Sequence, residues 1–193
     1  MKEYSVMIDI ETLGITPDTV VLTVGMVKFD PTSLDEPFDG VHIKINPKEQ
    51  KETGRVINRE TLEWWSKQDP EVRDAAFSPE GQSSVKKALE QIQEYFKVLD
   101  SQDHNQGSIY IRDVWGQGYG FDMTILNSLF RAFDMEAPWK FYQERDSRTW
   151  FDLMPGDPRP KEGKLQLHNA LSDAYYQAMG VQVVNKYIRD LKS

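Results

Sequence analysis

Two acidic residues near the start of the chain have the spacing of a metal-binding pair. Asp9 and Glu11 stand two positions apart at the end of an apolar run, residues 4–10, that has the composition of a buried strand. Side chains two positions apart on a strand point to the same face. Neighbouring carboxylates repel each other and lose hydration, and a divalent cation relieves both penalties. The alternative is a solvated strand end or a cap for the following turn.

A third acidic residue begins a helix that we expect over residues 121–133. Counting three, four and seven positions from Asp122 gives Ile125, Leu126 and Leu129, which form one apolar helical stripe. Asp122 therefore lies on the core-facing side, at the end of the helix that points toward the carboxyl ends of the strands. The helix dipole also favours an acidic residue in the first turn, but it does not explain the face.

A histidine and a fourth acidic residue precede or begin the last helix, which we expect over residues 169–191 with a bend at Gly180. Five positions do not place His168 and Asp173 on one helical stripe, so we expect His168 on the lead-in and Asp173 inside the helix. Histidine suits proton transfer near neutral pH, since its reference pKa is about 6.5. Taken alone, the pair also fits a histidine satisfied at a helix start.

Composition limits the chemistry that these residues can perform. The 193 residues include no cysteine, which excludes disulfides, zinc–thiolate sites and thiol catalysis. A metal site built from Asp, Glu and His favours hard ions such as Mg²⁺ or Mn²⁺. The net charge of −8 argues against a passive nucleic-acid-binding module, which is usually basic. It argues less against a metal-dependent nuclease, because bound ions neutralise acidic groups and attract phosphate.

The remaining pattern predicts one α/β domain over residues 1–193. We expect strands over residues 4–10, 20–29, 38–45, 109–115 and 140–144, and helices over residues 58–65, 85–99, 121–133 and 169–191. Asn58 is a plausible N-cap for the first of these helices. No apolar run approaches a membrane span, and residues 1–10 lack the long apolar core of a signal peptide. We therefore expect no membrane partner and a cytoplasmic location.

The combined pattern resembles a known enzyme class. Asp-x-Glu on the first strand, Asp at a later helix start and His-x-x-x-x-Asp before the last helix are similar to the DEDD exonucleases of the ribonuclease-H-like fold. The tyrosine subclass would carry Tyr at position 169, where this chain has Asn169, so the histidine subclass is favoured. A closer resemblance is to the family of T-even phage exonuclease A and the RNase AS-like exoribonucleases. The segments that carry it are residues 8–14 (IDIETLG), 61–65 (TLEWW), 120–122 (GFD), 145–149 (RDSRT) and 168–173 (HNALSD).

The resemblance implies a fold, an activity and roles for the five residues. The fold is a three-layer ribonuclease-H-like α/β arrangement with a central five-stranded mixed sheet flanked by helices. The activity is 3′-5′ exonuclease hydrolysis of single-stranded DNA or RNA with two Mg²⁺ ions, for which Mn²⁺ substitutes. Asp9 bridges the two ions, Glu11 and Asp173 complete the site of the attacking water, and Asp122 serves the other ion. His168 takes the proton from that water, so His168 and Glu11 are the expected catalytic residues.

The resemblance also implies a homodimer, and a host cytoplasm if the chain is phage-encoded. It places substrate contacts at Thr12, Leu13 and Gly14, with Leu13 wedged against the terminal base; the alternative is a turn residue packing on the core. Adjacent Trp64 and Trp65 cannot both face the core of a helix. One is expected to be core and the other a base-stacking platform, and the sequence does not assign them.

Three further points stay open in the sequence. Arg159, Lys161 and Lys164 precede His168, where they either guide the phosphates of the strand or are solvated loop charges. The glycines of residues 116–120 have G-x-G-x-G spacing, unlike a dinucleotide-binding loop, and we expect them to let this loop pass close to the site. A non-catalytic nucleic-acid-binding module on the same fold and an endonuclease are the alternative functions.

Overall fold

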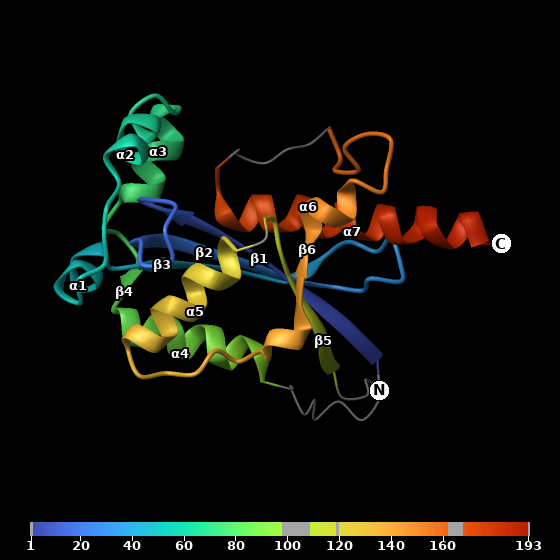
Figure 1. Ribbon diagram of the computed structural model, residues 1–193, viewed down its shortest axis with the longest axis horizontal. Helices are drawn as coiled ribbons and strands as arrows, with labels where there is room; N and C mark the ends of the chain where they lie inside the picture. Colours follow the sequence, from blue (N-terminus) through green and yellow to red (C-terminus); the bar gives the residue numbers. More distant parts are fainter. Residues whose placement is uncertain (1, 98–108, 119, 162–167, 193) are drawn as a thin grey trace.

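The computed structural model describes residues 2–97, 109–118, 120–161 and 168–192, and one mixed sheet organises these residues (Figure 1). Its six strands in this part of the chain have the order β4-β3-β2-β1-β5-β6. The strands are β1 (Lys2–Thr12), β2 (Val21–Phe29), β3 (Phe38–Ile45), β4 (Gln82–Ser83), β5 (Ile109–Gly116) and β6 (Glu144–Asp146). The helices are α1 (Pro47–Glu52), α2 (Arg59–Trp65), α3 (Pro70–Phe77), α4 (Val85–Phe96), α5 (Asp122–Ala132), the 3-10 helix η1 (Phe141–Gln143), α6 (Ser147–Phe151) and α7 (Ala170–Lys192).

The central strand is apolar because both of its faces are covered. β1 pairs with β2 in antiparallel and with β5 in parallel orientation. Its consecutive residues Val6, Met7 and Ile8 are fully buried. One face of the sheet packs against α4 and α5, and the other against α6 and α7 (Figure 1). This arrangement confirms the predicted three-layer ribonuclease-H-like fold.

A smaller core lies at the end of the sheet, beneath α2 and α3. It contains Leu13, Val20, Leu22, Trp65 and Ala76. The predicted cap of α2 is confirmed, since the side chain of Asn58 accepts a hydrogen bond from the backbone N–H of Thr61 at 3.1 Å. This core fixes the turn that follows the acidic end of β1.

The structure corrects the predicted elements where they are short. The sheet has six strands in the described residues and not five, because the two-residue strand β4 pairs with β3. The strand expected over residues 140–144 is a 3-10 turn followed by the three-residue edge strand β6. The helix expected to reach Leu99 ends at Phe96, and Leu99 lies outside the described residues.

α7 is assigned as a single helix that continues through Gly180. Gly180 makes room for a neighbour, since a Cβ there would lie 2.7 Å from Cζ of Phe151. No helix in the described ranges is long and apolar enough to cross a membrane.

Candidate active site

The end of β1 presents Asp9 and Glu11 toward the start of α7. Asp9 pairs with Gly25 of β2 in the sheet register. A Cβ on Gly25 would lie 2.1 Å from the carbonyl carbon of Ala170, the first residue of α7. Because Gly25 has no side chain, α7 starts in direct contact with the sheet beside Asp9. This close approach brings Asp173, in the first turn of α7, to the acidic pair.

Asp122 reaches the same place from α5. It is buried in the first turn of that helix, as its alignment with the apolar stripe predicts. A Cβ on Gly116, at the end of β5, would lie 2.9 Å from Oδ2 of Asp122. The same oxygen accepts a hydrogen bond from the backbone N–H of Gln117 at 3.0 Å. The expected close passage of this glycine loop is therefore confirmed at Gly116.

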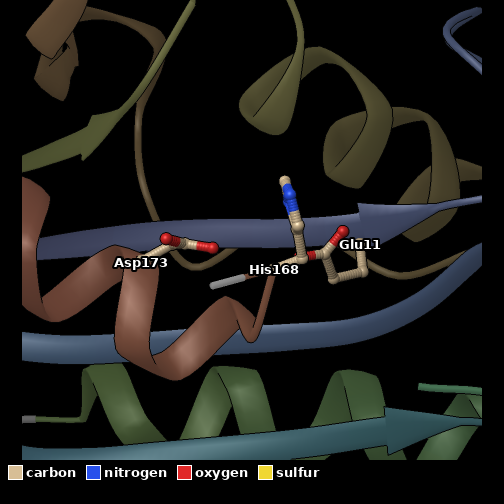
Figure 2. A group of neighbouring side chains, drawn as sticks. All are labelled: Glu11, His168 and Asp173. Atoms are coloured by element: carbon tan, nitrogen blue, oxygen red, sulfur yellow. The ribbon is translucent and has the colours of Figure 1, made fainter. Parts of the chain in front are cut away.

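Glu11, His168 and Asp173 converge on one point. One ligand atom from each of these side chains lies within 4.8 Å of the other two (Figure 2). His168 precedes α7 and Asp173 lies inside it, as the five-residue spacing predicts. His168 has a φ of 58°, a left-handed conformation that is uncommon outside glycine. The backbone therefore turns sharply at His168 as the chain enters α7.

The carboxylates make one another difficult to ionise. Burial raises the pKa of Asp9 well above its ordinary value, and the charges of Asp122, Glu11 and Asp173 raise it further. Burial, with repulsion from Asp173 and Asp122, raises the pKa of Glu11 to about 8. Burial raises the pKa of Asp122 to about 7 against several backbone hydrogen bonds that lower it. A bound cation would offset both the repulsion and the burial of these carboxylates. The oxygen and imidazole donors of the cluster fit a hard divalent ion.

A hollow of about 430 Å³ adjoins the acidic cluster at the end of β1. Glu11, Thr12, Gly14, Trp64 and Phe121 are among the residues that line it. The Trp64 ring also meets the His168 ring edge to face, with 5.0 Å between centroids. The hollow therefore joins an aromatic wall to the carboxylates.

Comparison with known proteins places this geometry in a family. A sequence model of the Rv2179c-like 3'-5' exoribonuclease domain matches residues 4–185. The chain belongs to this exonuclease family. Membership classes it as a 3′-5′ exonuclease, a hydrolase of phosphodiester bonds.

Individual relatives agree with this assignment. The exonuclease is 29% identical over 171 residues to a protein of Enterobacteria phage T4 named exodeoxyribonuclease, and the match covers 78% of this chain and 72% of the phage protein. Its fold is similar to that of E. coli exonuclease I in complex with an oligonucleotide, with a TM-score of 0.61, 15% identity and 99% of this chain covered. The chain spans 42% of exonuclease I. The nuclease domain of 3'hExo, a DEDDh family member bound to rAMP, matches with a TM-score of 0.57 and 12% identity over 97% of this chain and 92% of that domain.

Most of the expected substrate contacts of this exonuclease are buried, and Leu13 is one of them. Leu13 is 4% exposed and packs in the small core with Trp65, so its side chain does not face the hollow. This burial favours the alternative of a turn residue packing on the core over the expected wedge at Leu13. Among the apolar side chains that line the hollow, Ile15 is 71% exposed.

One tryptophan of the adjacent pair is buried and the other is exposed, as the sequence predicts without saying which is which. Trp65 is 1% exposed, and its Nε1 donates to the carbonyl oxygen of Thr12 at 3.0 Å. Trp64 is 41% exposed and stands at the hollow. Thr12 is buried, and its hydroxyl donates to the carbonyl of Gly14 at 2.6 Å. Trp65 and Thr12 thus hold the turn, and Trp64 is the candidate stacking residue.

One site residue was missed from the sequence. Nε2 of Gln177, in α7, donates to Oδ1 of Asp9 at 2.8 Å, while the other amide atom, Oε1, is buried without a hydrogen-bond partner among the described residues. Gln177 stands four positions after Asp173 and so shares its helix face. This four-residue spacing from Asp173 is the feature of the sequence that could have indicated Gln177 as a site residue.

Proposed function

We propose that this exonuclease removes nucleotides from the 3′ end of single-stranded nucleic acid by a two-metal mechanism. The observation that carries the proposal is the convergence of Glu11, His168 and Asp173 within 4.8 Å, beside Asp9 and Asp122. Two Mg²⁺ or Mn²⁺ ions, when bound, supply charge stabilisation for the attacking and leaving oxygens. The four carboxylates are the proposed ligands.

Each residue has a distinct role in this proposal. Asp9 accepts a hydrogen bond from Gln177 and is influenced by the charges of the other three carboxylates, which supports the proposal that it would hold both ions. Glu11 and Asp173 orient the attacking water near His168, which accepts its proton. Asp122 would hold the ion that stabilises the leaving oxygen. The terminal base occupies the hollow, against Trp64.

The relatives point to different sugars. The family is named for an exoribonuclease domain and the phage T4 relative is named an exodeoxyribonuclease. We therefore propose single-stranded DNA and RNA as the substrates to compare. We also propose a homodimer acting in the cytoplasm, a host cytoplasm if the chain is phage-encoded. Light scattering that gives the mass of one chain would contradict the dimer.

Two variants test the roles directly. His168→Ala should lose turnover by about 100-fold or more, the usual contribution of a general base, and still bind divalent ions. Asp9→Ala should lose both turnover and ion binding. Mononucleotide release and calorimetric titration with Mn²⁺ measure the two properties. Unchanged turnover in either purified, folded variant removes that residue from the mechanism.

A further inference from the structure

Gln117 connects the acidic cluster to two arginines. Its backbone N–H donates to Oδ2 of Asp122 at 3.0 Å. Its carbonyl oxygen accepts from Nη2 of Arg148 at 3.5 Å, and its side-chain Oε1 accepts from Nη1 of Arg159 at 3.3 Å. Both guanidinium groups therefore stand at the Asp122 side of the site.

The RDSRT segment, residues 145–149, ties the start of α6 to the loop that carries Gln117. Oδ1 of Asp146 accepts from the backbone N–H of Gly118 and from that of Arg148, each at 3.0 Å. The hydroxyl of Ser147 donates to the carbonyl of Gly116 at 3.1 Å. These bonds fix the backbone from which Arg148 extends, relative to the loop beside Asp122.

The two arginines differ in whether a carboxylate pairs with them. Arg159 forms a salt bridge with Asp157 at 2.7 Å, and its stem packs near Gly180 and the Phe151 ring. Its charge is therefore already compensated. Arg159 is thus a paired residue, which favours a structural role for it. Of the other members of this basic group, Lys161 is exposed and Lys164 lies outside the described residues.

Arg148 is exposed and forms no ion pair with any residue in the described part of the chain. Its charge still reaches the cluster. Burial raises the pKa of Asp122, and the positive charge of Arg148 is one of the influences that oppose this rise. The guanidinium of Arg148 thus lies near the carboxylate cluster without forming an ion pair with a carboxylate of the described residues.

An uncompensated guanidinium at a nuclease site fits a phosphate. Its planar donors match phosphate oxygens, and it stays charged at any physiological pH. In the proposed function Asp122 lies on the side of the leaving oxygen, which belongs to the nucleotide 5′ of the cut. We propose that Arg148 binds the phosphate one nucleotide 5′ of the scissile bond. This inference rests on the proposed function.

Substrates of two lengths isolate that contact. A dinucleotide NpN has only the scissile phosphate, whereas a trinucleotide NpNpN adds the phosphate assigned to Arg148. Arg148→Ala should lower kcat/KM on the trinucleotide by about 10- to 100-fold, as expected for a hydrogen bond to a charged group. On the dinucleotide, which lacks that phosphate, the loss should be much smaller, because only the influence of Arg148 on Asp122 is removed. Arg189→Ala, which removes an exposed arginine near the C-terminal end of α7, is the matched control and should alter neither.

A neutral methylphosphonate at the upstream linkage closes the cycle. It should lower kcat/KM of the wild type to the level of Arg148→Ala and leave that variant unaffected. An equal loss on both substrate lengths, or no loss on either, would overturn the assignment of Arg148 while leaving the exonuclease intact. A wild-type protein that cleaves neither substrate would instead overturn the proposed function, and this inference with it.

Discussion

The folded protein disfavours the ionised forms of the carboxyl groups in the cluster. Burial raises the pKa of Glu11 to about 8, with added repulsion from Asp173 and Asp122, and burial raises the pKa of Asp122 to about 7. In the unfolded chain the same groups ionise near their ordinary values of 4.5 and 3.8. The cluster therefore lowers the folding stability of the metal-free protein and provides ligands for cations.

We predict that the metal-free protein loses stability as pH rises from about 5 to 8. In that interval the unfolded state binds fewer protons than the folded state, so the free energy of unfolding falls with pH. Calorimetric melting can detect this, since about 1 kcal/mol shifts Tm by about 2–4 °C in a chain of this size.

Glu11→Gln should flatten the fall, and saturating Mg²⁺ should raise Tm most at pH 8, where the folded cluster can be ionised. A metal-free Tm that is constant or rises across the interval, and equal in wild type and Glu11→Gln, would show that the cluster is not strained.

We predict that substitution of one adjacent tryptophan weakens binding and that substitution of the other lowers stability. Trp64→Ala should weaken oligonucleotide binding by about 1–3 kcal/mol, the value of one stacked base, with little change in urea unfolding. Trp65→Ala should lower the free energy of unfolding by about 3–5 kcal/mol, because a buried ring is removed. Fluorescence anisotropy and urea titration measure the two effects. Unaltered affinity in Trp64→Ala would remove the stacking role.

Residue spacing predicted which acidic groups meet, but not which neighbours face the substrate. Asp9 and Glu11 share a strand face and Asp122 follows a helical stripe, so local periodicity was sufficient for both. Leu13 and Trp65 contact each other through the small core beneath α2 and α3. That contact joins segments far apart in the sequence, which periodicity does not report.

At the scale of elements, the contact between β2 and α7 determines whether the site assembles. We predict that Gly25→Ala lowers the free energy of unfolding by about 1–3 kcal/mol or more and abolishes turnover. The added Cβ would overlap the Ala170 backbone at 2.1 Å, and α7 would have to move away with Asp173. Gly156→Ala is the control, because nothing lies within 4 Å of a Cβ there. Equal stability and turnover in the two variants would refute the role of this contact.

The long elements were predictable and the short ones were not. β1, β2, β3, α4 and α7 carry enough residues for an apolar period to register. β4 and β6 have two and three residues and exist because a neighbouring strand offers hydrogen-bonding partners. α1 and α3 begin at Pro47 and Pro70 after side-chain caps from Asn46 and Asp69, so the sequence does contain a local signal for both helices.

At the scale of the whole molecule, an acidic chain must attract an acidic polymer. A net charge of −8 opposes phosphate binding unless cations intervene. Divalent ions at the carboxylate cluster would supply positive charge at the place where a strand end must lie. Arg148, which has no ion-pair partner among the described residues, would add to it. We therefore propose, as the central claim, that the cluster hydrolyses strand ends with divalent ions.

The measurement that tests this claim most directly uses matched single-stranded DNA and RNA oligonucleotides labelled at the 5′ end. We predict a ladder that shortens from the 3′ end only with Mg²⁺ and is absent with Asp9→Ala. The polymer that is degraded faster identifies the preferred sugar. Long internal fragments would indicate an endonuclease. Intact oligonucleotides with folded wild-type protein, in Mg²⁺ and in Mn²⁺, would contradict the account and favour a non-catalytic binding module.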